Sequence, residues 1–529
     1  MIEKSRSSIF LGIVAFGLAV VTFVLLHNDP RQLLLMRNTL LLAAGACAIG
    51  VPLGTLLACL LLRTDVGGRR AALLVLVTML FVPLYLQAAS WDAGFGQLGW
   101  HSLARNAMTE PLLDGWRAAI WVHAMAAVPW VALITGVAIC CGDAELEEQS
   151  LLAASTWQVL TFVTIPRALG GIVVAAFWVL LTVVVEMTVT DLYRVRTYAE
   201  EFYTGLALAD PQQPMALAAL PGITAGAALV SAASAVVLAA TPALRVPARM
   251  ARPMPLGGSR WWITLVVGML LLLIAGVPLG NLIYKAGMGL SHVEGQRVLS
   301  WSPWQFARIA GLSPWKFRVE IGWTIVIGGI ASTAALAVGA PLAWWTRRGG
   351  WRALPAVSLV ALGTVVPGPL IGLSVIWLLD RQSPAICMWL YDRSVFAPVL
   401  AILVRVLPVT VLMCWYTFRS ISDDVLDSAA CEGAGYWTQF GLIAVPIRWA
   451  GLATAWLAGF AIATGDLACS ILVVPPGVTT VSVRVFGLIH AGVDDQVAGL
   501  CLTVVVGVAA LAAASTVMLR TAGKGGQAA

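Results

Sequence analysis

The sequence predicts an all-α polytopic membrane protein with about 12 transmembrane helices, arranged as two parallel six-helix repeats. Composition is the first reason, because 60% of the 529 residues are hydrophobic and only 11% are charged. A soluble chain could not bury so much apolar surface. The second reason is a series of apolar runs of about 20 residues, the length that crosses a hydrocarbon core roughly 30 Å thick. The third is a loop pattern that occurs twice, 280 positions apart.

Apolar runs lie on both sides of a polar connector, and each side holds the same number of them. The expected helices lie near residues 8–27, 38–62, 71–90, 116–141, 171–193, 215–240, 261–283, 321–345, 354–379, 396–418, 449–474 and 496–518. The connector, Thr241 to Arg260, is rich in proline and arginine, which is typical of an extended linker. The sequence therefore predicts a first repeat at 1–245, a cytoplasmic linker at 246–260 and a second repeat at 261–529. Because each repeat has an even number of helices, both copies of the loop pattern are expected on one face of the membrane.

The repeated loop pattern covers residues 143–166 and 423–446. Its first copy, E-E-Q-S-L-L-A-A-S-T-W-Q-V-L-T-F-V-T-I-P, begins at Glu147. Its second copy, D-S-A-A-C-E-G-A-G-Y-W-T-Q-F-G-L-I-A-V-P, begins at Asp427. In each copy an acid opens the segment, a small residue follows six positions later, and a proline ends it.

This pattern resembles the EAA loop of ATP-binding-cassette (ABC) importer permeases. In that family the loop forms cytoplasmic coupling helices that dock in clefts of separate ATPase subunits. The resemblance implies the type I importer permease fold. It also implies a coupling role for the matching positions, which are Glu147, Glu148, Ala153, Trp157, Pro166, Asp427, Ala429, Gly433, Trp437 and Pro446. The second copy matches well, whereas the first has Glu148 where the family has alanine and Ala153 where it has glycine.

The resemblance also implies partners and a location. ATP would be used by separate ABC ATPase subunits, expected in two copies, and a periplasmic or extracellular binding protein would deliver the substrate. No cofactor is expected on this chain, which lacks a G-x-x-x-x-G-K-[ST] loop and is not expected to be an enzyme. The chain is expected in the bacterial inner membrane among lipids, with both termini cytoplasmic. The fusion of two permease halves and the segment from Pro475 to Gly492 resemble ferric-iron permeases, with thiamine or another substrate as the alternative.

Three charged residues fall inside apolar runs, where ionisable groups are costly. Glu186 and Asp466 each follow the motif proline by 20 residues, and Arg405 lies about halfway along its predicted helix. Two interpretations stay open. The acids line the substrate path with Arg405 as a counter-ion, or they form buried ion pairs that lock helices together. The five histidines lie near the predicted outer face without ligand spacing, so no metal site is predicted.

Other classes of protein fit the sequence less well. A secondary transporter of the major facilitator type also has six plus six helices, and the segment Asp65 to Arg70 echoes its D-R-x-G-R-R loop. That class leaves the doubled motif unexplained. A membrane-embedded enzyme would need a cluster of His, Asp and Glu on one helix face, which the sequence lacks. Nucleic-acid binding is not expected, because the chain has no long basic run.

Overall fold

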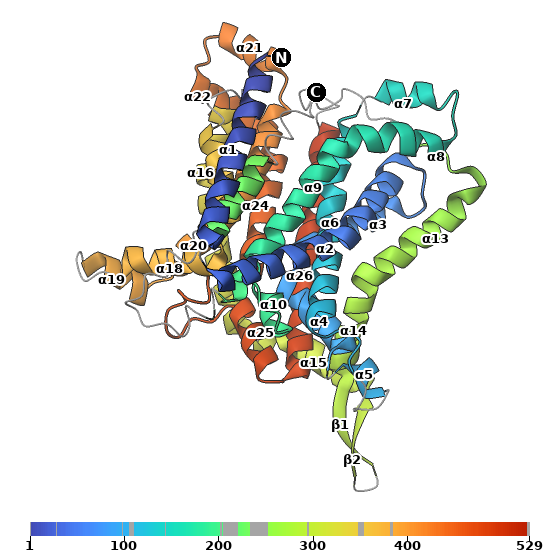
Figure 1. Ribbon diagram of the computed structural model, residues 1–529, viewed down its shortest axis with the longest axis vertical. Helices are drawn as coiled ribbons and strands as arrows, with labels where there is room; N and C mark the ends of the chain where they lie inside the picture. The colour runs from blue at the N-terminus through green and yellow to red at the C-terminus, as the bar shows by residue number, and fades with distance from the viewer. Residues whose placement is uncertain are drawn as a thin grey trace. The chain divides into compact units, whose positions relative to one another are not determined.

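The computed structural model describes residues 2–27, 29–97, 99–104, 110–142, 144–201, 204, 221–232, 252–293, 296–347, 354–380 and 385–525 (Figure 1). Contacts divide the chain into two units, and each is described by itself. The first unit is Met1–Leu80 with Leu84–Ile309, and the second is Phe81–Pro83 with Ala310–Ala529.

The first unit is helical apart from one hairpin. Its elements are α1 (Ile2–His27), α2 (Pro30–Arg63), α3 (Arg69–Phe81), α4 (Leu84–Phe95), α5 (Trp100–Ala104), α6 (Gly115–Cys140), α7 (Ala144–Ser150), α8 (Thr156–Val159), the π-helical turn η1 (Leu160–Thr164), α9 (Ile165–Val185), α10 (Thr188–Leu192), the 3-10 turn η2 (Gly257–Ser259), α13 (Arg260–Leu271), the π-helical turn η3 (Leu272–Gly276), α14 (Val277–Gly287), β1 (Met288–Val293) and β2 (Gln296–Trp301). The two strands pair antiparallel, with Met288 opposite Trp301. The hairpin lies at the end of this unit opposite to α7 (Figure 1).

The boundary between the two units falls within α15 (Pro303–Lys316), whose residues up to Ile309 belong to the first unit and whose residues from Ala310 belong to the second. The other elements of the second unit are α16 (Arg318–Thr346), α17 (Leu354–Val365), α18 (Gly368–Leu379), α19 (Ala385–Asp392), α20 (Phe396–Arg419), α21 (Asp423–Cys431), α22 (Tyr436–Thr438), the π-helical turn η5 (Gln439–Ala444), α23 (Val445–Ile447), α24 (Trp449–Gly465), α25 (Val481–His490) and α26 (Asp494–Gly525). Within this unit α21 and α25 lie at opposite ends (Figure 1).

Many of these helices are suited to a membrane. Among the described residues, seven helices are long and apolar enough to cross one, or up to nine if each of two bent pairs counts as one span. This supports the prediction of an all-α polytopic membrane protein. The arrangement of twelve helices in two repeats stays a prediction, and the helix expected at 215–240 lies largely outside the described residues.

Two helices that were predicted as single spans are broken in the structure. The run 71–90 is divided between α3 and α4, which are bent by 104° at the break that contains Pro83. The run 354–379 is divided between α17 and α18, with Pro367 as the N-cap of the second half. Proline has no amide hydrogen and clashes with the preceding turn, so each helix is interrupted there.

Small residues let the long helices approach closely in both units. A Cβ added at Gly54 of α2 would lie 2.5 Å from the Cβ of Val131 on α6. In the second unit, a Cβ at Gly459 of α24 would lie 2.9 Å from Val406 on α20. Without a hydrophobic force between helices in lipid, such close backbone contacts are what hold them together.

The contact units do not follow the predicted repeat boundary. The helix formed by α13, η3 and α14, which was expected to open the second repeat, belongs to the first unit. Asn281 of α14 donates to the carbonyl oxygen of Ser90 on α4 at 3.0 Å and accepts from the Trp100 indole at 3.0 Å. The division at 246–260 therefore stays a prediction about the sequence duplication and does not describe the packing.

Candidate functional site

The first motif loop is a pair of short helices joined by a turn. α7 ends at Ser150, and α8 begins after Ser155, whose hydroxyl and backbone exchange hydrogen bonds with Gln158 in a capping box. Such a box satisfies the free amides at a helix start. Ala153 lies in the turn between them. Among the described residues, Arg194 is the one non-glycine residue with a positive φ. The backbone of Ala153 is therefore not left-handed, and this turn does not require glycine.

The second motif loop has the same order of elements but a different turn. α21 is capped at its start by Ser422 and ends in a turn where the Gly433 amide bonds to Ala430 and the Ala434 amide to Ala429. Gly433 has φ of 89°, which side chains rarely adopt, so glycine is needed here to end the helix. The glycine of the family pattern therefore ends a helix in the second loop, whereas the first loop makes its turn with Ala153.

Both loops end in a π-helical turn, which leads directly into α9 in the first loop and into the short α23 in the second, where an 80° bend precedes α24. In the first, the Ile165 amide bonds to the Leu160 carbonyl, five residues back, and in the second the Val445 amide bonds to Phe440 in the same way. The motif proline follows at once in each case, at the second position of its helix. Both π turns end 280 positions apart, at Thr164 and Ala444. This shared local geometry supports the alignment of the two loops.

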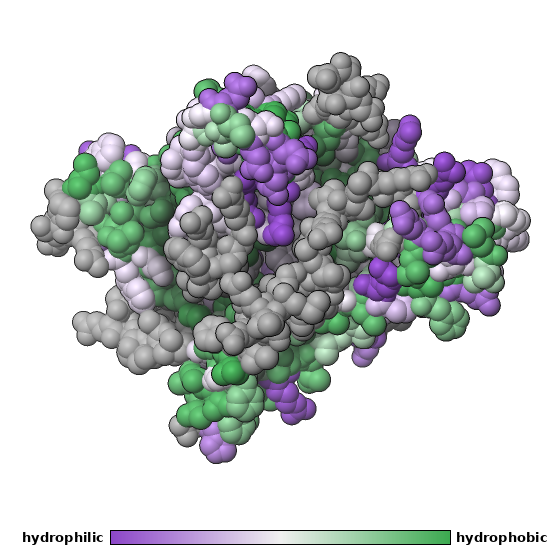
Figure 2. All heavy atoms as spheres, turned by 90° about the horizontal axis from the view of Figure 1, so that it is seen from above, coloured by the Kyte–Doolittle hydropathy of each residue, from purple (hydrophilic) through white to green (hydrophobic). Residues whose placement is uncertain are grey.

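The two loops expose apolar side chains at matching places. Trp157 is 46% exposed and Trp437 58%, while Phe162 and Leu442, also aligned, are 78% and 74% exposed. In the space-filling view of Figure 2, hydrophilic side chains lie beside apolar ones on the face that it draws. Exposed apolar groups that gather in a patch are typical of surfaces that contact another protein or the membrane.

The remaining predicted coupling residues differ in exposure. The exposed ones are Ala153, Pro166, Asp427, Gly433 and Pro446, and Glu148 and Ala429 are partly buried. Glu147, in contrast, is buried, and its carboxylate lies 3.2 Å from the Arg63 guanidinium at the end of α2. Thr164 also donates to Glu147 at 3.0 Å. The opening acid of the first loop thus ties the loop to its own bundle.

The second loop is tied to its bundle by aromatic side chains. Trp344 at the end of α16 is fully buried against Phe418, Tyr436 and Phe440, with ring centroids 5.4 to 5.9 Å apart. The Tyr436 hydroxyl donates to the Trp344 carbonyl oxygen at 2.8 Å, and the Trp344 indole donates to the Tyr436 carbonyl at 3.3 Å. Asp427, the opening acid here, is exposed and takes no part in this anchor.

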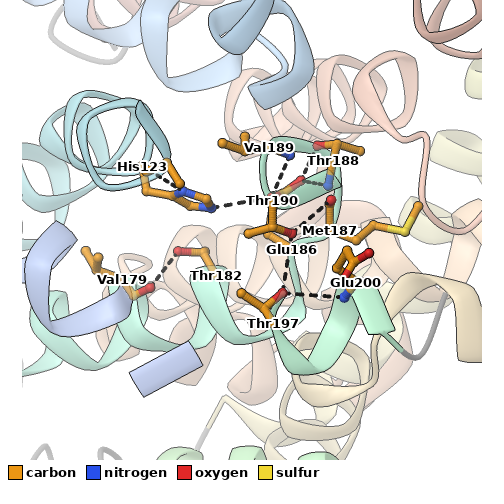
Figure 3. Close-up of polar contacts among 11 residues, drawn as sticks. His123, Val179, Thr182, Glu186, Met187, Thr188, Val189, Thr190, Thr197 and Glu200 are labelled. Atoms are coloured by element: carbon orange, nitrogen blue, oxygen red, sulfur yellow. Dashed lines mark hydrogen bonds and ion pairs between the residues drawn. The ribbon is translucent and has the colours of Figure 1, made fainter. Parts of the chain in front are cut away.

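Glu186 was expected inside a helix at 171–193, but it ends that helix. α9 stops at Val185, and Glu186 is its C-cap with an extended backbone. Its carboxylate accepts from the Thr188 amide at 2.6 Å and the Val189 amide at 3.1 Å, and the Thr188 hydroxyl also donates to it (Figure 3). The side chain thereby caps α10, because carboxylates satisfy the free amides at a helix start.

His123 of α6 lies beside Glu186 (Figure 3). Its Nε2 lies 3.4 Å from the Glu186 carboxylate, and both side chains are largely buried, at 3% and 13% exposed. Its Nδ1 lies 2.8 Å from the Ala119 carbonyl oxygen, which can only accept, so Nδ1 carries a hydrogen. This partner was missed from the sequence, because the histidines were assigned to the outer face.

Asp466 has the same position in the second unit. It was expected inside a helix at 449–474, but α24 stops at Gly465 and Asp466 is its extended C-cap. Its carboxylate accepts from the Cys469 amide at 3.2 Å and so caps the next turn. Arg405 of α20 lies close enough to act on it electrostatically. We call Glu186 and Asp466 the hinge acids, because each one ends a long helix and starts a short segment.

The segments that follow the hinge acids are also held alike. The Tyr198 amide donates to the Thr39 hydroxyl of α2 at 3.0 Å, and the Val481 amide donates to the Thr324 hydroxyl of α16 at 2.8 Å. Among the described residues, no group of three or more His, Cys, Asp or Glu side chains could hold a metal ion. The geometry thus gives each unit a motif loop at one end of a long helix and a capped hinge acid at the other.

Comparisons with known proteins agree with a transport role. No protein-family model matches the chain. It is similar to the molybdenum transport system permease protein ModB of Azotobacter vinelandii, 26% identical over 178 residues that make up 32% of this chain and 79% of the relative. It is also similar to the putrescine transport system permease protein PotI of Escherichia coli strain K12, 25% identical over 179 residues, 34% of this chain and 63% of the relative. These relatives are permease subunits of transport systems and support the resemblance to importer permeases, but they give no support to ferric iron.

Proposed function

We propose that this chain is the transmembrane permease of a bacterial ABC importer and carries both halves of the translocation unit. The observation that carries this proposal is the pair of motif loops. Each has two short helices, an exposed tryptophan at the same place, and a π turn before the motif proline. The similarity to two permease subunits supports the same conclusion.

The mechanism that this geometry suits is the transfer of movement along α9 and α24. Separate ATPase subunits, expected as a pair, bind the exposed faces of the two loops and move them as ATP is bound and hydrolysed. In the first loop the backbone hydrogen bonds run through the π turn into α9, whereas in the second loop the π turn leads into the short α23, and an 80° bend at Arg448 separates α23 from α24. Each of the two long helices ends at a hinge acid, which also caps the next segment. Movement at the loop is therefore delivered to the hinge, where the chain changes direction.

The substrate proposal is narrower and rests on the sequence alone. Ferric iron, delivered by a periplasmic binding protein, is favoured by the segment from Pro475 to Gly492, which contains α25. The relatives are named for molybdenum and putrescine, so they do not point to one chemical class of substrate. Thiamine and other substrates are the alternatives to iron. A secondary transporter is the alternative class, and co-purification of an ATPase subunit would argue against it.

The decisive experiment is Gly433→Glu in the second loop. A Cβ here would meet nothing within 4 Å, so the change adds bulk and charge to the exposed face. We expect the protein to insert normally, while ATP-dependent uptake by cells falls at least about tenfold, as for the loss of a central contact in an interface.

The matched control is Gly68→Glu. Gly68 has φ of 69°, is exposed, and also has open space around it, so the backbone strain is similar but no motif loop is touched. Wild-type uptake by the Gly433 variant with the ATPase still bound would contradict the docking model. An equal loss in both variants would assign the effect to strain.

A further inference from the structure

An aromatic and basic cluster lies where α15 meets α16. It consists of Trp315, Lys316, Phe317 and Arg318 from this junction, with Arg484 from α25. Trp315 is 69% exposed, Lys316 and Arg318 are exposed, and Phe317 is buried beneath them. The proposed transport function makes no use of this cluster.

Contacts within the cluster orient its cations without neutralising them. The Arg318 guanidinium lies 4.6 Å from the centre of the Trp315 ring and donates to the Trp315 carbonyl oxygen at 3.2 Å. The Lys316 ammonium lies 5.5 Å from the centre of the Phe317 ring. Arg484 pairs with Glu320 at 3.4 Å. In the described part of the chain, no carboxylate forms an ion pair with Lys316 or Arg318, so the cluster keeps two positive charges.

The face of α15 beside the cluster is apolar and has no partner among the residues that the structure describes. Trp304, Leu312 and Trp315 are 78%, 54% and 69% exposed, and Arg308 between them is also exposed. Their spacing of three and four residues places them along one side of the helix. α15 contains no acidic residue. The side is thus a stripe of tryptophan and leucine with cations at its middle and end.

The cluster lies at the end of α16 that is opposite the second motif loop. α16 begins at Arg318, and Trp344 near its other end packs on Tyr436 of that loop. The 29 residues of α16 rise about 43 Å at 1.5 Å each, which is more than the hydrocarbon thickness of roughly 30 Å. The start of α16 therefore emerges at the level of the lipid headgroups.

We propose that this face of α15 lies in the membrane interface and that Lys316 and Arg318 bind the phosphate of an anionic phospholipid. Tryptophan favours the boundary between headgroups and acyl chains, where its ring is apolar and its N–H can reach water. Arginine stacked on an aromatic ring still presents its donors in a fork that fits a phosphate. A lipid is the occupant that fits both parts of this surface, since its acyl chains cover the stripe and its phosphate meets the cations.

The test measures lipid retention by the purified full chain. Nanodiscs made of phosphatidylcholine with a minority of phosphatidylglycerol are exchanged into detergent, and the lipid that stays bound is counted by native mass spectrometry. Each basic residue near an anionic surface contributes about fivefold in binding. The double variant Lys316→Gln/Arg318→Gln is therefore expected to retain phosphatidylglycerol roughly 25-fold more weakly.

The control variant is Arg393→Gln, an exposed arginine that follows α19 at the same end of the second unit and stands next to Asp392. It should retain the lipid as the wild type does, and free inorganic phosphate should not displace the lipid. Equal retention by the wild type and the double variant would overturn the proposal. It would also be overturned if the double variant keeps the lipid but loses stimulation by the substrate-binding protein, because the cluster would then be a protein-docking surface.

Discussion

The two motif loops have the same order of local elements but are held to their bundles by different chemistry. The first is anchored by a buried ion pair between Arg63 and Glu147. The second is anchored by Trp344, Tyr436 and their aromatic neighbours. At the 280-residue offset, Tyr436 falls on Thr156, so this aromatic anchor has no counterpart in the first loop.

This difference separates what faces a partner from what holds the loop in place. The aligned tryptophans are exposed in both loops, whereas the opening acid is buried in one and exposed in the other. A partner that docks on both loops would therefore meet tryptophan twice and the acid once. The acid that opens the motif is buried in the first loop, where it holds the loop in place, and it is exposed to a partner in the second.

The largest effect is expected from Arg63→Met. The change leaves Glu147 buried without its cation, and breaking a buried pair in this way costs about 3–5 kcal/mol. We expect less folded protein in the membrane and a first loop that proteases cut more readily at Leu152, which is 89% exposed. Protein abundance and limited proteolysis measure these two effects.

Rescue distinguishes an ion pair from simple packing. The double variant Arg63→Met/Glu147→Gln removes the stranded charge and should recover most of the lost abundance, since an apolar or neutral replacement of both partners is often tolerated. Asp427→Asn, the aligned change in the second loop, should leave abundance unchanged. If Asp427→Asn were as damaging as Arg63→Met, the two acids would have the same role and the comparison would be wrong.

A smaller effect is expected at the hinge acids. In Asp466→Asn the amide can still cap the next turn, but Arg405 keeps its charge at any physiological pH and loses its counter-ion. In Glu186→Gln the partner is the imidazole of His123, which, unlike a guanidinium, has a neutral form, so the change need not strand a charge. We therefore expect Asp466→Asn to destabilise the protein by about 1–3 kcal/mol and Glu186→Gln by less.

Abundance and uptake together decide between the two interpretations of these acids. Arg405→Met should restore the abundance of Asp466→Asn if the pair is structural. Normal abundance of both acid variants with reduced uptake would instead place the acids on the substrate path. Wild-type abundance and uptake in both variants would rule out either role.

The sequence was sufficient for the features that depend on local patterns. Apolar runs predicted most of the long helices, because burial in lipid requires length and apolar character. The repeated motif predicted both loops and their common proline. Its offset also placed Glu186 and Asp466 at equivalent positions, which the structure confirms by making each the C-cap of its helix.

Features that depend on tertiary contacts could not be predicted. Arg63 and Glu147 are 84 positions apart, and Arg63 looked like an ordinary loop cation at a helix end. The apolar pattern continues past Glu186, so the end of α9 is set by amides that the carboxylate caps and not by hydropathy. His123 was assigned to the outer face, because only the packing of α6 against the hinge reveals its partner.

The smallest effect is expected from Tyr436→Phe, which removes one hydroxyl from the aromatic anchor. The ring still packs on Trp344, but the hydrogen bond to the Trp344 carbonyl oxygen is lost. A single neutral hydrogen bond contributes about 1 kcal/mol, so we expect a lower unfolding midpoint with uptake nearly unchanged. Thr156→Ala in the first loop is the matched control, because it also removes one hydroxyl that donates to a backbone carbonyl, that of Pro255 at 2.8 Å. Tyr436 is partly buried and Thr156 lies in an exposed hydrogen bond, where water replaces the lost partner, so the second change should cost less. If Tyr436→Phe instead abolished uptake at normal stability, the aromatic anchor itself would take part in coupling. The distinction between residues that face a partner and residues that hold the loop in place would then not apply to the second loop.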